Sequence, residues 1–211
     1  LTEANKQFII IGNMNAITYK EIFPLIKDNK MWLGNGFHNG NAFFRIVSER
    51  DYADGVYDSE TGLVKFRNCC WLTNIDHGRR HEPLKLMTMA ENFKHSKHKE
   101  IRERKEYQHY ENFNAIDIPY TDSIPSDFDG VMGVPISFLD KYCPEQFEII
   151  WRGGDIEWCE NESDFYTPPT AEKAALYKKK DKTWRIQNPY VVDKDGNANV
   201  VYQRILIRKK Q

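Results

Sequence analysis

The sequence lacks the short motifs that identify many nucleotide- and cofactor-binding enzymes. It contains no GxGxxG, no P-loop and no GxSxG segment, so it predicts neither a dinucleotide loop nor a nucleophile elbow. Its four cysteines, at positions 69, 70, 143 and 159, show no CxxC spacing, which is typical of a reduced chain. No apolar run approaches the roughly 20 residues of a membrane helix, and no signal peptide is recognisable. We therefore expect a cytoplasmic protein without a membrane partner.

An excess of charge of either sign is also missing, but the charges are unevenly placed. The 211 residues hold 30 Lys and Arg against 31 Asp and Glu, for a net charge of -1. Residues 94–105 nevertheless contain six bases and two acids, whereas residues 155–164 contain five acids and no base. DNA binding needs only a local positive surface, so the neutral total does not exclude it.

A β-α-β unit is predicted at the start of the chain. Residues 7–12 form an unbroken apolar run, typical of a strand buried on both faces of a parallel sheet. A capping box predicts a helix from residue 19 to about 28, with Pro24 bending it or delaying its start. Residues 31–33 predict the next strand, so the unit spans 33 residues.

The rest of the chain predicts an irregular mixture of strands and turns. Residues 87–110 are polar and predict a mobile loop with a helical piece near residues 100–107. Residues 152–200 have no strong periodicity and predict an elaborated insertion. Strands are expected at residues 42–47, 63–72 (with a bulge), 115–119, 147–151 and 200–208, and turns at residues 58–62 and 122–130.

The most informative stretch is a buried strand followed by a cationic loop. Cys69 to Leu72 predict the strand, and Pro83 closes the loop. Such a loop is suited to present donors to an anionic partner. The alternative is a solvated turn in which the arginines pair with Asp76 and Glu82. The candidate donors are Asn74, His77, Arg79 and Arg80.

Three further patterns each leave two interpretations open. The spacing of His77 and His81 would suit zinc on a helix, but Gly78 and Pro83 disfavour a helix and the intervening arginines would repel a cation, so no metal is expected. Asn13 and Asn15 either bind a ligand edge or only form a turn. Phe43-Phe44-Arg45 either offers a stacking face with Arg45 near phosphate, or contributes to the core.

A tempting catalytic match is rejected on chemical grounds. Thr167-Pro168-Pro169-Thr170 superficially matches the Pro-Pro loop of amino methyltransferases. That chemistry needs Asn or Asp before the prolines, to accept from the target amine, and an aromatic ring after them, to stack on the base. The segment from Phe128 to Gly133 likewise lacks the spacing of a methyl-donor loop.

Four separated blocks together resemble the EcoRI-type adenine-specific DNA methyltransferases. They are FIIIGNMNAITYKEIFPLIKDNKMWLG, CCWLTNIDHGRRHEPL, YTDSIPSDFDGVMGVPISFLDKYCPEQFEI and the terminal RILIRKK. The resemblance covers most of residues 7–151 and the last ten residues. It does not cover residues 152–200 or the histidine-rich segment 94–110.

The resemblance implies an α/β fold: part of a doubly wound methyltransferase-like sheet followed by an irregular α+β target-recognition region. Residues 1–50 would be the rear part of the catalytic sheet, and residues 51–211 the DNA-reading region with its closing strand. Phe44 aligns with a block whose aromatic residue packs on the flipped base, although the proline of that block is absent here. The implied DNA contacts are Asn74, His77, Arg79, Arg80, Lys85, Arg45, Arg204 and Arg208.

The implied reaction is methyl transfer from S-adenosylmethionine to adenine N6 in double-stranded DNA. The family's methyl-donor and catalytic loops should precede the strand at Phe8. We therefore expect no catalytic residue in this chain, little donor binding by it alone, and no transfer. The alternatives are a non-catalytic DNA-binding or specificity module and a small metal-dependent hydrolase that uses residues 76–82.

Overall fold

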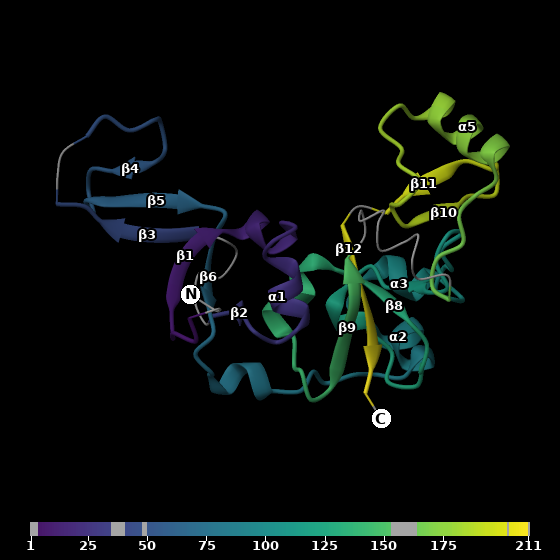
Figure 1. Cartoon of the computed structure of the whole chain (residues 1–211), viewed down its shortest axis with the longest axis horizontal. Coiled ribbons are helices and arrows are strands. Elements are labelled where there is room, and N and C mark those ends of the chain that lie inside the picture. Colours follow the sequence, from purple (N-terminus) through teal and green to yellow (C-terminus); the bar gives the residue numbers. More distant parts are fainter. Residues whose placement is uncertain (1–3, 35–40, 48–49, 153–163, 202, 211) are drawn as a thin grey trace. The chain divides into compact units, whose positions relative to one another are not determined.

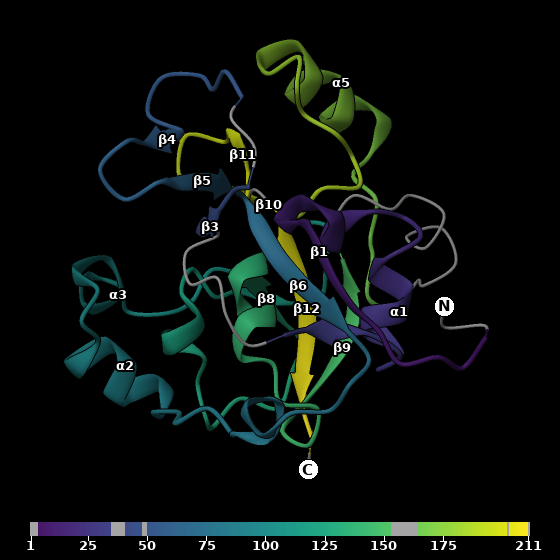
Figure 2. The same cartoon turned by 90° about the vertical axis from the view of Figure 1, so that its left-hand side faces the viewer.

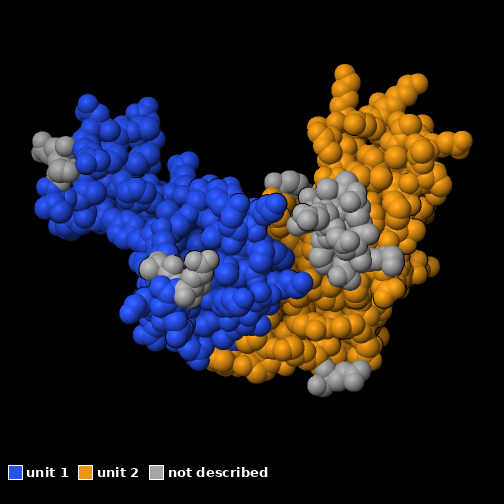
Figure 3. All heavy atoms as spheres, in the orientation of Figure 1, with its two compact units in different colours: residues 1–80 blue, residues 81–211 orange. Residues whose placement is uncertain are grey.

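The computed structural model describes residues 4–34, 41–47, 50–152, 164–201 and 203–210. The chain divides into two compact units, residues 1–80 and residues 81–211, which Figure 3 colours separately. The functional boundary expected near residue 50 stays a prediction, because compactness alone does not assign a role. Among the described helices, none combines the length and apolar character needed to cross a bilayer.

Two antiparallel three-stranded sheets make up most of the described part of unit 1 (Figure 1). One has the strand order β1-β6-β2 and the other the order β3-β5-β4. The strands are β1 (Ile9–Asn13), β2 (Trp32–Leu33), β3 (Asn41–Arg45), β4 (Tyr57–Asp58), β5 (Leu63–Arg67) and β6 (Cys69–Thr73); the helical turns are η1 (Met14–Thr18), α1 (Phe23–Lys27) and η3 (Gly78–His81).

The first strand differs from the prediction of a buried parallel strand. β1 pairs antiparallel with β6, and its residues Ile9, Ile10 and Ile11 are 60%, 41% and 45% exposed. The apolar run was therefore correctly predicted as a strand, but its burial and pairing were wrong. β2 is also antiparallel to β6, so β1 and β2 run in the same direction with β6 between them. The predicted β-α-β order is confirmed in that form.

The first helix is shorter than predicted because proline sets its start. Thr18 does not cap it: the Thr18 hydroxyl donates to the Asn15 carbonyl inside η1. Pro24 occupies the first turn of α1, where its missing N–H costs no helical hydrogen bond. The expected delay at Pro24 is confirmed.

One predicted strand is two strands in separate sheets. Residues 63–72 divide at Asn68, whose φ of 55° lies in the left-handed region. Asparagine tolerates this region better than β-branched residues do. The chain therefore leaves β5 and enters β6 in the other sheet, where sequence predicted only a bulge.

A four-stranded sheet forms the core of unit 2, with the order β7-β8-β12-β9. Its β7–β8 pair is parallel, and its other pairs are antiparallel. Figure 2 shows β8, β12 and β9 side by side from a second direction. Trp151, Tyr110 and Leu206 belong to the buried cluster on this sheet. The strands are β7 (Ile116–Asp117), β8 (Met132–Pro135), β9 (Phe147–Arg152) and β12 (Arg204–Lys209), and the short turns are η4 (Thr121–Ser123) and η5 (Ile136–Lys141).

The segment predicted as a mobile loop contains two ordered helices. These are α2 (Met89–His95) and α3 (Lys99–Glu103). Thr88 and Glu91 form a capping box at the start of α2, in which each side chain accepts from the backbone N–H of the other residue. The mobile-loop prediction was wrong for these residues, although α3 overlaps the expected helical piece.

Part of the expected insertion is a small α/β element with its own core. It contains α5 (Ala171–Lys180), β10 (Tyr190–Val192) and β11 (Ala198–Val200). Thr170, at the end of the Pro-Pro segment, caps α5 by accepting from the Lys173 N–H. Tyr177, Trp184 and Tyr190 form a buried cluster between α5 and the hairpin. Residues 153–163 lie outside the described part of the chain.

Candidate nucleic-acid interface

Asn74 lies at the end of β6 and joins it to the segment before β1. The Phe8 backbone N–H donates to Asn74 Oδ1 at 2.9 Å, and Asn74 Nδ2 donates to the Lys6 carbonyl at 2.9 Å. The neighbouring Thr73 hydroxyl donates to the Phe8 carbonyl at 2.7 Å. The oxygen and the nitrogen of the Asn74 side-chain amide therefore both form hydrogen bonds within unit 1. Contacting a base edge would require these hydrogen bonds to break.

Arg80 packs into unit 1. Its guanidinium carbon lies 3.9 Å from the centroid of the Trp32 ring, a cation–π contact. Its Nη2 donates to Asn29 Oδ1 at 2.8 Å, and its Nη1 lies 3.6 Å from Asp76 Oδ1. The pairing of an arginine with Asp76, foreseen as the alternative interpretation, is confirmed. The Arg80 side chain is only 11% exposed.

His77 and Arg79 complete this loop. His77 Nε2 lies 3.0 Å from the Leu33 carbonyl oxygen; because a carbonyl only accepts, Nε2 carries the proton. Arg79 is half-buried and also has an interaction partner. The loop from Asn74 to Arg80 is thus a packed connection within unit 1, and the expectation that it presents free donors is not supported by this geometry.

His81 and Asn13, two further polar candidates, also have partners inside their own units. His81 Nδ1 lies 2.8 Å from Glu145 Oε1. Asn13 Oδ1 accepts from the Asn15 N–H at 2.8 Å, which is the simple turn foreseen as one alternative. No group of three or more potential metal ligands is brought together among the described residues.

The two arginines of the closing strand both form ion pairs within the sheet, Arg204 with β7 across β8 and Arg208 with the adjacent β9. Arg204 Nε lies 2.8 Å from Asp117 Oδ1, and the Tyr110 hydroxyl donates to the same oxygen at 2.7 Å. Burial, and then the Asp117 carboxylate, raise the pKa of Tyr110 well above its usual value, so the phenol stays a donor. Arg208 lies 2.5 Å from Glu148, its register partner on β9. Lys85, by contrast, is exposed.

The β3–β5 pair places Phe43 and Phe44 on opposite faces. Phe44 is half-buried and packs edge-on against Phe66, with 5.6 Å between ring centroids. Phe43 is 58% exposed. Arg45 is exposed, with its guanidinium 3.5 Å from the Thr61 carbonyl. Of the two adjacent rings, Phe43 is the more exposed, one position away from the residue that sequence favoured.

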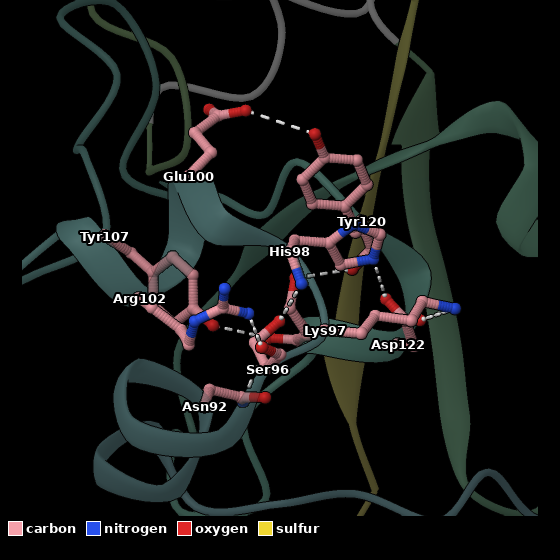
Figure 4. Close-up of polar contacts among 10 residues, drawn as sticks. Asn92, Ser96, Lys97, His98, Glu100, Arg102, Tyr107, Tyr120 and Asp122 are labelled. Carbon is pink, nitrogen blue, oxygen red and sulfur yellow. Dashed lines mark hydrogen bonds and ion pairs between the residues drawn. The ribbon is translucent and has the colours of Figure 1, made fainter.

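The base-rich segment 94–105 carries its own counter-charges (Figure 4). Asp122 accepts from Lys97 at 2.6 Å and from His98 at 2.9 Å, and the His98 ring stacks on Tyr120 with 3.6 Å between centroids. Lys99 and Arg104 pair with glutamates of their own helix. The positive potential expected from composition is thus partly neutralised by acids nearby in space.

This cluster makes a pH-dependent contribution to stability. Burial raises the pKa of Asp122, but hydrogen bonds from Lys97 and His98 outweigh it and hold that pKa below its ordinary value of 3.8. A carboxyl with a lowered folded-state pKa stabilises above its unfolded pKa, and this contribution disappears as pH falls through the folded value. We expect Asp122→Asn to cost about 1 kcal/mol at pH 7, reduced by partial exposure.

The measurement is urea unfolding of wild type and Asp122→Asn between pH 7 and pH 3. The stability difference should shrink below about pH 4, because the wild-type carboxyl then also becomes neutral. Glu103→Gln is a matched control, since Glu103 is an exposed partner of Lys99 on the helix surface. A difference that stays constant with pH would show that the Asp122 charge does not stabilise this cluster.

Comparison with known proteins places these observations in a family. The model of the family described as adenine-specific methyltransferase EcoRI matches residues 1–210. The chain belongs to this family. The match includes residues 152–200, which the resemblance seen in the sequence did not cover.

Three curated relatives agree with the family match. The chain is 42% identical over 154 residues to the type II methyltransferase M.EcoRI of Escherichia coli, covering 71% of this chain and 44% of the relative. It is 30% identical over 155 residues to M.MpnI of Mycoplasma pneumoniae, covering 71% and 45%. It is 31% identical over 159 residues to M.MgeORF184P of Mycoplasma genitalium, with the same coverages. The chain thus spans about half the length of these relatives. No solved structure matches it.

Proposed function

We propose that this EcoRI-family chain is part of a site-specific methyltransferase that transfers a methyl group from S-adenosylmethionine to adenine N6 in double-stranded DNA. The observation that carries the proposal is the family match over residues 1–210, together with 42% identity to a type II methyltransferase. We also propose that the β1-β6-β2 sheet belongs to a larger doubly wound sheet. The common direction of β1 and β2 and the exposed isoleucines of β1 support this extension.

Two of the described glycines, Gly12 and Gly133, do not fit a methyl-donor loop. Such a loop needs glycines that leave open space for the donor. A Cβ at Gly12 would lie 3.3 Å from the Leu72 side chain, and one at Gly133 would overlap Tyr110. Neighbouring side chains therefore occupy the space at both glycines. The proposal accordingly assigns donor binding mainly to residues outside this chain, and no catalytic step to the residues described.

The proposed role of this chain is to hold the duplex. Arg45 and Lys85 are exposed and remain candidates for phosphate contacts. Asn74, His77, Arg80 and Arg204 would instead support the shape of the surface, since their polar atoms have partners within their own units. Phe44 would support the β3–β5 pair from its half-buried face.

The test is methyl transfer by the full-length gene product. Incubation with labelled S-adenosylmethionine and a panel of duplexes should place the label on N6 of adenine in a subset of sequences. A duplex already methylated at N6 of that adenine is the matched control and should accept no label. Label on cytosine, or none on any duplex, would contradict the proposal. Sequence-selective binding without transfer would favour the non-catalytic specificity module.

A further inference from the structure

The β3-β5-β4 sheet has two chemically different faces. Directly paired residues of antiparallel strands lie on the same face, and alternate residues share it. One face is therefore largely apolar, with Ala42 and Val64 each 1% exposed. The other face pairs Phe43 with Lys65, and it also contains Arg45 and Arg67 on the same two strands. We call this second set, Phe43, Arg45, Lys65 and Arg67, the cationic-aromatic face.

Among the residues that the structure describes, the charges on this face have no acidic partners. Within the described residues, Arg45, Lys65 and Arg67 take part in no ion pair, whereas Arg204 and Arg208 each contact a carboxylate. The Lys65 ammonium lies 5.8 Å from the centroid of the exposed Phe43 ring. The face thus combines an exposed aromatic ring with three cations that form no ion pair among the described residues.

One described acid, Asp58 of β4, lies on this face at its edge. It pairs with Leu63, which in turn pairs with Arg45, and directly paired residues share a face. Its carboxylate accepts from the backbone N–H groups of Glu60 and Thr61, at 2.9 Å and 3.3 Å. The other acids of residues 51–60 are exposed, namely Asp51, Asp54 and Glu60. The positive part of the face is therefore the β3–β5 pair.

We propose that the cationic-aromatic face is a contact surface for the sugar–phosphate backbone of duplex DNA. Alternate residues of a strand are about 7 Å apart, and the charges of one DNA strand advance by about 3.4 Å per nucleotide along the helix axis. Lys65 and Arg67 on β5, with Arg45 on β3, are therefore far enough apart to contact different phosphates. The Phe43 ring between them supplies an apolar contact to deoxyribose. The inference rests on the proposed function, because that function supplies the duplex.

The test measures duplex binding by the full-length protein as a function of salt. Each lost phosphate contact lowers the slope of log affinity against log salt by about 0.9. R45A/K65A/R67A should therefore lose about 2 to 3 units of slope and at least about tenfold in affinity, equally for all duplex sequences. K20A/K141A/K194A removes the same charge from exposed positions elsewhere, and it should retain the wild-type slope.

Phe43 is tested separately because it carries no charge. F43A should weaken binding by about 5- to 10-fold with the salt slope unchanged, and F43L should recover part of the loss. Circular dichroism should show F43A folded as wild type, since the ring is exposed. Wild type that binds no duplex would contradict the proposed function and this inference together. Wild type that binds, with R45A/K65A/R67A keeping its full slope, would overturn this inference alone.

Discussion

Replacing Arg204 with methionine should destabilise unit 2 by about 3–5 kcal/mol. Arg204 and Asp117 side chains are only 13% and 6% exposed, and the Arg204 guanidinium supplies the positive charge facing the carboxylate. Methionine would fill a similar volume but carries no charge. The described side-chain hydrogen bond to the Asp117 carboxylate would then come from the neutral Tyr110 hydroxyl. Hydrogen exchange of peptides from β8 and β12 would report the change within unit 2.

The double variant D117N/R204M tests whether the loss of stability comes from leaving the Asp117 carboxylate without its positive partner. Removing both charges should recover about half of the destabilisation, because an asparagine oxygen can still accept from Tyr110. If Arg204 instead contacts DNA phosphate, as sequence suggested, R204M would leave exchange unchanged and lower the salt slope of DNA binding by about 1. That result would contradict the structural role assigned here.

Sequence was most informative for strands whose apolar residues alternate with polar ones, or form an unbroken apolar run, between turn residues. Residues 42–47 and 147–151 were predicted as strands, and the structure contains β3 (Asn41–Arg45) and β9 (Phe147–Arg152) in their places. The closing strand was predicted for residues 200–208, but β12 begins at Arg204 and Val200 belongs to β11. These elements are specified locally, by the two-residue period of side chains in a sheet.

The environment of the cationic loop could not be predicted because its partners are distant in sequence. The residues that hold Arg80 and His77 include Asn29 and Leu33, about forty to fifty positions earlier in the chain. A local pattern of charge cannot distinguish an arginine stacked on Trp32 from one facing solvent. The sequence therefore identified an unusual loop and left two interpretations open, and the structure shows the pairing of an arginine with Asp76.

Sequence favoured Phe44, whereas Phe43 is the more exposed of the two rings, for a related reason. Alternation predicts that one of Phe43 and Phe44 points outward, but not which one. The pairing of β3 with β5 decides it, since it sets Phe44 against Val64 on the buried face. Lys65 and Arg67 become relevant only through the same register, which links positions more than twenty residues apart.

Replacing Gly133 with alanine should destabilise unit 2 by about 3–5 kcal/mol, combining steric overlap with a strained buried hydrogen bond. A Cβ at Gly133 would lie 2.2 Å from the Tyr110 hydroxyl oxygen and 2.6 Å from a ring carbon. Neither the Gly133 backbone nor the Tyr110 side chain can move easily. Gly133 lies in β8 between two hydrogen-bonded strands, and Tyr110 is held by Asp117.

Two further variants isolate the steric cause at Gly133. Gly78→Ala places a Cβ with no atom within 4 Å, so it should change the free energy of unfolding by less than about 1 kcal/mol. Y110F/G133A removes the closest oxygen but leaves ring carbons at 2.6 Å and 2.7 Å, and should therefore be only partly rescued. If the hydrogen exchange of the β8 peptides in Gly133→Ala matched that of wild type, Tyr110 could move away from Asp117 without cost. That outcome would also remove the Tyr110–Asp117–Arg204 network as a support of the unit 2 sheet.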